Sequence, residues 1–436
     1  MILLDCRGTM LATTRTLIRH SVLSAALLLA NAAGAQAPSP LDQCNLKDEA
    51  AFEQRIAGCS AVITAGQFQG KDLAFAFVNR GEAYYDKKDY DRAISDFGEA
   101  LQRDPQLAAA YNGRGRAYRA KDEPDLAIAD QNKALDLEPN MVRALNNRGN
   151  AFLDKLDIER AIADQTEAIK LDPNFGAAFS SRGFTYYVRG DFDRLASGPG
   201  AGTADYDRAI ADLTEALRLD PAYAQGFRLR ATVHTAKGDM DRAVADYDAL
   251  LKLDPQSAYA YFKRGAIFAA TDKVDRALAD FAEAVRINPN YEDAYEARTR
   301  IFLARRDWDN AIPNYTEMIR LNPSGDNLAF VGRADAYRNK GDFDRAMTDY
   351  NEAIRLNPKL AAAFASRGVL YREKNDFDRA LADFNEALRL EPKNFAVYFE
   401  RAQAYRKKGD QSKATADEDE GKRLRECLAQ PASCPK

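Results

Sequence analysis

An acidic residue or asparagine followed by proline recurs along this 436-residue chain at an almost constant interval. The sequence number of the proline rises by 34 from one pair to the next, except for one step of 48 and one of 35. A period of this length predicts an array of similar units in place of one conventional core. The nine dipeptides are Asp104-Pro105, Glu138-Pro139, Asp172-Pro173, Asp220-Pro221, Asp254-Pro255, Asn288-Pro289, Asn322-Pro323, Asn357-Pro358 and Glu391-Pro392.

Apolar residues within each repeat have the spacing of helices. When each repeat starts three residues after a proline, one stripe falls at positions 4, 8 and 11, as in Phe364, Gly368 and Tyr371. A second stripe falls at positions 20, 21, 24, 27 and 28, after a turn rich in glycine and aspartate. Both stripes are helical, and the proline ends the second helix, so each repeat is predicted to be a helical hairpin. The repeats begin near Ala74, Ala108, Val142, Gly176, Ala224, Ala258, Glu292, Asn327, Ala361 and Phe395.

A hairpin of this length buries too little apolar surface alone, so the repeats must stack on their neighbours. The period, and the order aromatic, glycine, aromatic, alanine, aromatic, alanine and proline along each repeat, resemble the tetratricopeptide repeat. The resemblance extends from Ala74 to Cys427. It implies an all-α fold, a right-handed superhelical α-solenoid of about ten repeats whose first helices line a concave groove. We assign the array to residues 74–428 and a C-terminal tail to residues 429–436.

Several repeats depart from this pattern. Position 11 of the fifth repeat is His234, where the other repeats favour an aromatic residue. The tenth repeat has Glu418 and Gly421 in place of the aromatic residue and alanine, so its second helix is predicted to be a polar cap. At position 8, four repeats have another residue in place of glycine: Ala231, Thr299, Ala334 and Ala402. At position 24, two repeats have glutamine in place of the aromatic residue: Gln131 and Gln165.

The fourth repeat is longer than the others, because it contains the step of 48 between Pro173 and Pro221. Two similar four-residue sequences, at 191–194 and 205–208, flank a segment rich in glycine, Ser197 to Gly202. This composition predicts a flexible insertion at residues 191–207, which loops out between the two helices without breaking the array. It is either an inert insertion or a contact with a partner.

Residues 1–35 have the pattern of a signal peptide. Arg15 and Arg19 precede the apolar run from Val22 to Ala30, and the small residues 33–35 provide a cleavage site. The run is shorter than the roughly 20 residues of a membrane helix, and no later run reaches that length. We therefore expect a periplasmic or secreted protein that is soluble and has no transmembrane segment after cleavage.

Four cysteines remain after removal of the signal peptide, an even number in a chain that enters an oxidising compartment. One pair precedes the array and the other follows it, so of the three possible pairings we predict Cys44 with Cys59 and Cys427 with Cys434. A metal site is the alternative, but these spacings lack the histidines that zinc usually requires. Residues 36–73 are assigned to a leader helix that carries the first pair.

The composition argues against nucleic-acid binding and catalysis. The 62 lysines and arginines nearly balance 66 acidic residues and are mixed with them, so no strong field would attract a polyanion. His234 is the one histidine after the signal peptide, and we predict a packed core residue instead of a general base. No second histidine is present to complete a triad or a metal site. We expect no enzymatic activity, no cofactor and no metal.

Position 7 is arginine in every repeat, and position 23 is aspartate in all but the seventh, which has Asn314. These residues could form a ladder that binds anions, or could join the two helices of each repeat. A feature that every repeat needs is better suited to the stack than to one ligand, so we predict the structural role. The residues are Arg80, Arg114, Arg148, Arg182, Arg230, Arg264, Arg298, Arg333, Arg367 and Arg401, with Asp96, Asp130, Asp164, Asp212, Asp246, Asp280, Asp349, Asp383 and Asp417.

By resemblance to the family, positions 2, 5, 6, 9, 12 and 13 face the groove. In the second and third repeats, asparagine amides there could hold the backbone of an extended peptide while arginines bind its acidic groups. A solvated polar surface is the alternative. The predicted ligand-binding residues of this polar segment are Asn112, Arg116, Arg119, Arg143, Asn146, Asn147 and Asn150.

The middle of the groove is predicted to be apolar, which suits an apolar peptide anchor or a helix face. Packing between the repeats is the alternative. The residues are Phe184, Tyr187, Tyr259, Phe262, Ala266, Ala269 and Ala270.

Arg338, Arg372 and Arg406 share position 12 in successive repeats and would form a basic strip for an acidic ligand segment. The carboxylate clamp of co-chaperone relatives is not reproduced, because its lysines are missing. We predict a non-catalytic scaffold of the bacterial cell envelope that binds a protein or peptide. The alternative is an accessory subunit of an envelope enzyme or of a polysaccharide-export complex.

Overall fold

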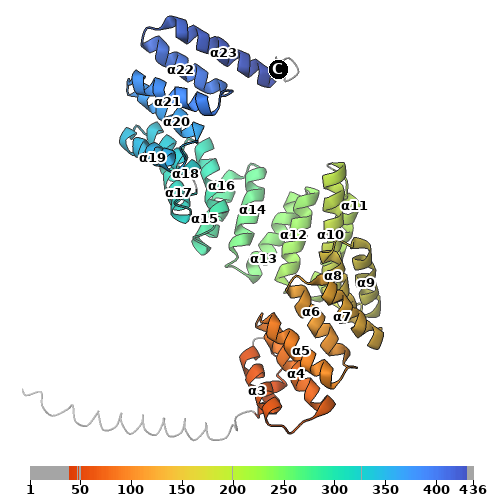
Figure 1. Ribbon diagram of the computed structural model, residues 1–436. Helices are drawn as coiled ribbons and strands as arrows, with labels where there is room; N and C mark the ends of the chain where they lie inside the picture. The colour runs from red at the N-terminus through yellow and green to blue at the C-terminus, as the bar shows by residue number, and fades with distance from the viewer. Residues whose placement is uncertain (1–38, 47, 49–50, 199, 326, 430–436) are drawn as a thin grey trace, which may run out of the picture. The chain divides into compact units, whose positions relative to one another are not determined.

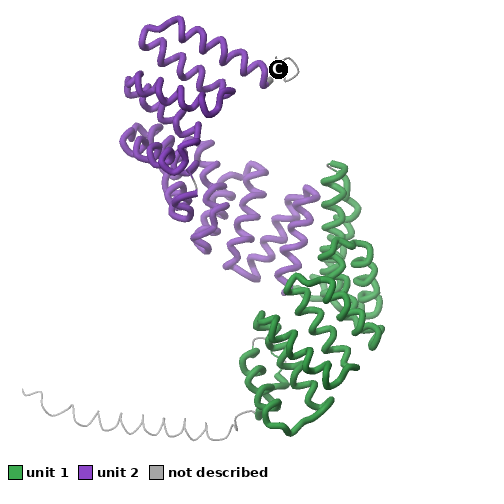
Figure 2. The backbone as a smooth tube through the Cα atoms, viewed as in Figure 1, with its two compact units in different colours: residues 1–221 green, residues 222–436 purple. Residues whose placement is uncertain are grey.

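The computed structural model describes residues 39–429 except 47, 49–50, 199 and 326. Every regular element in that part of the chain is an α-helix (Figure 1). The chain divides into two compact units, residues 1–221 and residues 222–436, called here the N-terminal unit and the C-terminal unit (Figure 2). The predicted signal peptide at 1–35 lies outside the described residues.

The N-terminal unit contains two short leader helices and the first four hairpins. Each hairpin packs against the next one in the chain. The leader helices are α2 (Pro40–Cys44) and α3 (Phe52–Thr64), and the hairpins are α4 (Gly70–Asp86) with α5 (Tyr90–Arg103), α6 (Ala108–Ala120) with α7 (Pro124–Leu137), α8 (Val142–Asp154) with α9 (Ile158–Leu171), and α10 (Gly176–Ser197) with α11 (Thr203–Leu219).

The C-terminal unit contains the other six hairpins, again stacked in chain order. They are α12 (Ala224–Lys237) with α13 (Met240–Leu253), α14 (Ala258–Ala270) with α15 (Val274–Ile287), α16 (Glu292–Ala304) with α17 (Trp308–Leu321), α18 (Asn327–Asn339) with α19 (Phe343–Leu356), α20 (Ala361–Glu373) with α21 (Phe377–Leu390), and α22 (Phe395–Lys407) with α23 (Gln411–Ala429).

Helix boundaries follow the local sequence signals. From α6 onward, every first helix begins at the residue that the repeat period predicts. Several second helices are capped by the aspartate of the turn, as where the Asp342 carboxylate accepts a hydrogen bond from the Arg345 amide at 3.2 Å. The first repeat is an exception, because α4 starts at Gly70, before Ala74 and within the predicted leader. No proline precedes this helix as one precedes the others, so its first turn extends further back.

Small residues allow the two helices of a hairpin to meet. A Cβ atom added at Gly368 would lie 2.7 Å from the Phe384 ring, closer than any contact a side chain could make there. The alanines of positions 20 and 27 in the same repeat, Ala380 and Ala387, are fully buried. Aromatic rings therefore fill space that the glycine leaves open, as the sequence pattern predicts.

The prediction that residues 191–207 form a flexible loop is wrong. Helix α10 continues to Ser197 and α11 begins at Thr203, so the extra residues lengthen both helices of the fourth hairpin. The added turns repeat the contacts of the regular hairpin one heptad further along: Arg189 pairs with Asp205 at 2.7 Å, as Arg182 pairs with Asp212. Gly190 lies against the buried ring of Tyr206. Pairing between the two helices explains why most of residues 191–207 are helical.

The leader contains two helices instead of one, joined by the predicted disulfide between Cys44 and Cys59. Gly58 allows this contact, since a Cβ atom there would lie 2.7 Å from the backbone nitrogen of Cys44. Helix α3 packs on α4 in the way that the second helix of a preceding repeat would, and Arg80 donates to Ser60 at 3.1 Å. The leader is thus a half-repeat that covers the first end of the stack.

The other predicted bridge joins Cys427 to Cys434, and Cys434 lies outside the described residues. Helix α23, which carries Cys427, packs on α22. It is longer than the other second helices of this unit. In the last hairpin, Gly421 faces the ring of Phe399, where a Cβ atom would lie at 3.1 Å.

Candidate functional site

First helices of successive repeats contact one another along the N-terminal unit and at the end of the C-terminal unit. The side of each unit that carries the first helices is called here the first-helix face. In the N-terminal unit, α4 contacts α6, α6 contacts α8, and α8 contacts α10. In the C-terminal unit, α18 contacts α20, and α20 contacts α22. The helical spacing of the predicted groove positions places them on this face.

The arginine and aspartate ladder is structural in nine repeats, as predicted. In each of them, Nε and Nη2 of the position-7 arginine donate to both carboxylate oxygens of the position-23 aspartate at 2.6–3.0 Å. The aspartates are buried, so these bidentate pairs hold the two helices of a hairpin together. The seventh repeat lacks the pair.

Two of the four predicted asparagines are largely buried within the stack. Asn112 and Asn146 are each 6% exposed, and Asn112 accepts a hydrogen bond from Asn147 at 2.8 Å. Asn150 accepts one from Gln165 at 3.2 Å. The Asn112 and Asn147 amides therefore connect two neighbouring repeats, whereas Asn150 bonds within its own repeat. The role of these amides in binding a peptide backbone stays a prediction.

The predicted arginines of the same segment differ in their surroundings. Arg116 pairs with Glu82 at 3.1 Å and lies over the ring of Tyr85. Arg119 makes a bidentate pair with Asp154, at 2.6 and 3.1 Å. Arg143 is exposed. Arg119 is exposed as well, but of the three predicted arginines only Arg143 has no carboxylate partner among the described residues.

A polar cleft of about 740 Å³ lies on the first-helix face of the N-terminal unit. It brings Arg116 and Arg143 together with residues of the leader and of α4 that sequence reasoning missed. Three of these missed residues, Asn79, Glu82 and Asp86, occupy positions 6, 9 and 13 of the first repeat. These are groove positions in the family, so the resemblance could have identified them. The leader residues could not be found in this way. The lining residues are Asn45, Leu46, Arg55, Asn79, Glu82, Asp86, Arg116 and Arg143.

The predicted apolar residues are divided between the two units. In the N-terminal unit, the rings of Phe184 and Tyr187 lie 6.1 Å apart, and Phe184 is 39% exposed. The others belong to α14 in the C-terminal unit, where Phe262 contacts the rings of Phe281 and Tyr291 at 5.8 and 4.9 Å. Burial, with Asp293 nearby, raises the pKa of Tyr291 to about 12, so this ring is neutral near pH 7.

Helix α16 has a cleft on each side. The cleft toward α14, of about 340 Å³, has an apolar floor that includes Phe262, Ala266 and Ala269 from the predicted set, with Phe281 and Ile301. The cleft toward α18, of about 400 Å³, is lined by Leu303, Met318 and Leu328 among others.

The two clefts share Glu296 and Arg300, which pair at 2.6 Å. Glu292 and Asp293 add two further acidic side chains to the rim. Sequence reasoning missed these α16 residues, although Asp293, Glu296 and Arg300 occupy groove positions 2, 5 and 9 of their repeat. The combined site is therefore an apolar floor with a rim of net negative charge.

The predicted basic strip is neutralised by neighbouring acidic residues. Arg338 pairs with Glu373 at 2.7 Å, Arg372 pairs with Glu400 at 2.8 Å, and Arg406 pairs with Glu418. Each arginine therefore has a carboxylate partner within the protein. A ligand with acidic groups would have to compete with these pairs.

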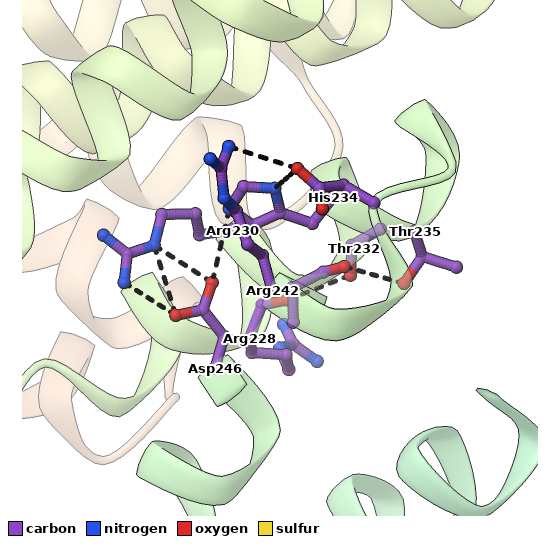
Figure 3. A network of polar contacts seen from close by, with 9 residues as sticks. Arg228, Arg230, Thr232, His234, Thr235, Arg242 and Asp246 are labelled. Carbon is purple, nitrogen blue, oxygen red and sulfur yellow. Dashed lines mark hydrogen bonds and ion pairs between the residues drawn. The ribbon is translucent and has the colours of Figure 1, made fainter. Parts of the chain in front are cut away.

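His234 is 4% exposed and lies in α12 beside the Arg230 and Asp246 pair and Arg242 (Figure 3). Its Nδ1 is 3.7 Å from Asp239 and its Nε2 is 3.9 Å from Asp246, too far for strong hydrogen bonds. Burial lowers the pKa of His234, although both carboxylates oppose the change. The position is that of a packed core residue, as predicted.

The described part of the chain also bears on membranes and metals. None of the helices there is long and apolar enough to cross a membrane. No group of three or more histidine, cysteine, aspartate or glutamate side chains in that part is arranged to hold a metal ion.

Comparison with known families finds matches along most of the array. Family models described as tetratricopeptide repeat match residues 74–107, 108–141, 142–175 and 229–302. A model described as TPR repeat matches residues 334–372 and 368–409. Together these matches cover more than half of the chain. A comparison with curated proteins finds no match.

Solved structures of repeat proteins are similar to this one. A tetratricopeptide repeat protein from Parabacteroides merdae has 21% sequence identity and a TM-score of 0.37, with 60% of this chain and 98% of that chain covered. The C-terminal part of a repeat protein from Cytophaga hutchinsonii has 18% identity and a TM-score of 0.46, with coverage of 58% and 97%. YrrB, described as a TPR protein with an unusual peptide-binding site, has 20% identity and a TM-score of 0.36, with coverage of 46% and 97%.

Proposed function

Because this chain belongs to the tetratricopeptide-repeat family and folds as an all-α solenoid, we propose that it is a non-catalytic scaffold that binds a protein or peptide. The observation that carries the proposal is the pair of clefts beside α16. They lie on the first-helix face of three successive repeats and share two side chains. An apolar floor with a charged rim suits a protein segment, since burial of an apolar side chain provides affinity and the rim orients it.

The site contains no arrangement suited to catalysis. Its titratable side chains are carboxylates on the rim, the Arg300 guanidinium and Tyr315. His234, the candidate base, is buried in α12 and is not among the residues that line either cleft. These observations support a binding role over an enzymatic one.

We further propose that the protein acts in the cell envelope, as a periplasmic or secreted protein. The signal-peptide pattern of residues 1–35 supports this location, and so does the disulfide between Cys44 and Cys59, which persists in oxidising compartments. The mass of the chain recovered from an exported fraction tests the location. Export predicts a chain that begins near Gln36.

The binding role can be tested by selecting peptides from a displayed random library on the full chain. Ala269 is exposed on the floor of the cleft toward α14, so Ala269→Arg should fill the cleft without disturbing the core. We expect selected peptides to bind this variant about tenfold more weakly or worse, because the long arginine side chain occupies their site and its charge offsets the acidic rim.

Ala279→Arg is the matched control, because Ala279 is also exposed but lies on the second helix α15. It should leave peptide binding unchanged. Equal binding to the wild type and to Ala269→Arg would place the binding surface elsewhere. A library that yields no binder to the wild-type chain would contradict the scaffold proposal itself.

A further inference from the structure

The seventh repeat breaks the arginine and aspartate ladder. Its arginine, Arg298, faces a second helix that carries Asn314 in place of aspartate. The Asn314 amide donates to the backbone carbonyl of Asn310 at 2.7 Å. Arg298 therefore has no carboxylate at the position where nine other repeats provide one.

A second partner is missing at the same place. In six repeats, Nη1 of the arginine also donates to a side chain on the second helix of the preceding repeat, 16 or 17 residues earlier. For Arg298 the residue 16 positions earlier is Ala282, which offers only a methyl group. The six partners are Asn132, Thr166, Asp248, Thr316, Asn351 and Asn385.

The guanidinium of Arg298 is consequently a partly buried charge without a counterion. Its Nε is buried without a hydrogen-bond partner, and no carboxylate among the described residues forms an ion pair with it. Burial lowers the pKa of Arg298, whereas the hydrogen bond with Asp349 raises the pKa of Arg333, the same position one repeat later. Arginine stays protonated at neutral pH even so, and an unpaired buried charge is costly.

The missing partners lie on the solvent side of the stack. Asn132, Asn351 and Asn385, which contact the guanidinium in other repeats, are exposed side chains. The corresponding Nη atoms therefore reach the surface in the regular ladder. Ala282 is half-buried and carries no polar side chain, so the seventh repeat lacks the partner that the guanidinium has at this position in six other repeats.

We propose that Arg298 is an anion-binding site, in which an oxyanion, carboxylate or phosphate, binds the guanidinium beside Ala282. A planar guanidinium matches both groups through paired N–H donors. This site is separate from the clefts of the first-helix face, and it does not depend on the proposed scaffold function.

Hydrogen exchange of the full chain tests the site, with sodium phosphate, sodium acetate and sodium chloride compared at equal ionic strength. We expect phosphate or acetate to slow amide exchange in α16 and α17, and to raise the Tm by about 2–4 °C, because the ligand binds the folded state alone. The anion that acts identifies the chemical class. If neither acts beyond chloride, the proposal is wrong.

Variants of the ladder separate a specific site from a general salt effect. Asn314→Asp provides an internal carboxylate and should abolish the anion response while slowing basal exchange. Arg298→Met should also abolish the response. The double variant Asp349→Asn with Thr316→Ala removes both partners of Arg333 and should create a new response in α18 and α19. An unchanged response in Asn314→Asp or Arg298→Met, or no new response in the double variant, would overturn the site.

Discussion

At the scale of single residues, the arginine at position 7 and the aspartate at position 23 hold the two helices of most hairpins together. The aspartate is buried between the two helices, and the arginine reaches it from the partly exposed side. A buried carboxylate without its partner would be costly, so each pair specifies how one hairpin closes. His234 departs from the repeat pattern, since it takes the place of an aromatic ring beside the Arg230 and Asp246 pair.

His234 should make stability depend on pH. Because burial lowers its pKa from 6.5, the folded chain binds fewer protons here than the unfolded chain does. Its contribution is complete above pH 6.5 and is lost as the pH falls below that value. Urea unfolding of the wild type between pH 7.5 and 5.5 should therefore show falling stability, and His234→Phe should reduce the slope.

The aromatic variant keeps the pattern of other repeats, where Phe268 and Tyr371 occupy this position. Asp239 and Asp246 remain in both proteins, so the difference between the two slopes isolates the histidine. Identical slopes for the two proteins would show that His234 is protonated equally easily in the folded and unfolded states.

The fourth hairpin shows at the scale of elements how this fold accommodates extra residues. The extra residues lengthen both α10 and α11, and they repeat the glycine, aromatic and arginine contacts of the regular hairpin. Phe192 and Leu195 are exposed on the added part of α10. Two helices lengthened together keep their pairing, whereas a change in one alone would leave its apolar residues without a partner.

Deletion of residues 191–204 should restore the regular period of the array at the fourth repeat. Gly190 would then take the turn position that Gly238, Gly341 and Gly409 occupy with positive φ, and Asp205 would cap the shortened second helix. We expect the Tm to change by no more than about 4 °C, as measured by circular dichroism.

Deletion of residues 191–197 alone is the matched control, because it shortens α10 and leaves α11 intact. It should lower the Tm more than the longer deletion does. If the longer deletion unfolds the N-terminal unit, the added turns are required for folding and the interpretation as an extended hairpin is incomplete.

Contacts at the scale of the whole molecule are between neighbours in the chain. Each hairpin packs against the next within its unit, and the leader covers the first end through α3. In such a chain, stability is close to a sum of repeat and interface contributions. A destabilising change at one end should therefore affect only the neighbouring repeats.

The variant Cys44→Ser with Cys59→Ser tests this locality. The bridge joins cysteines whose sequence separation is 15, and its loss should lower local stability by about 3 kcal/mol. Hydrogen exchange should become faster in α2, α3 and α4, and should stay unchanged from α18 to α22. Equal acceleration at both ends would show that the array unfolds as one cooperative unit.

Local sequence signals determined most of the fold. The constant repeat period predicts each hairpin and, from α6 onward, the first residue of every first helix. The paired positions of Arg and Asp, the buried place of His234 and the Cys44–Cys59 bridge also follow from sequence. Phe262, Ala266 and Ala269 were predicted from the groove positions, and the structure places them together in one cleft. The hairpins, the Arg and Asp positions and the groove positions repeat at short range, so a helical pattern is enough to predict them. The bridge follows instead from the place of its two cysteines before the array.

Only the tertiary structure decided which individual side chains are paired or buried by contacts between helices and repeats. Arg338, Arg372 and Arg406 pair with acidic residues, two of which lie in the following repeat, and Asn112 and Asn146 are buried by their neighbours. The residues 191–207 are largely helical because α10 and α11 pair with each other. The leader acts as a half-repeat because α3 packs on α4. A side chain's partner often lies in another helix or another repeat, and a periodic pattern alone does not reveal whether that partner binds it.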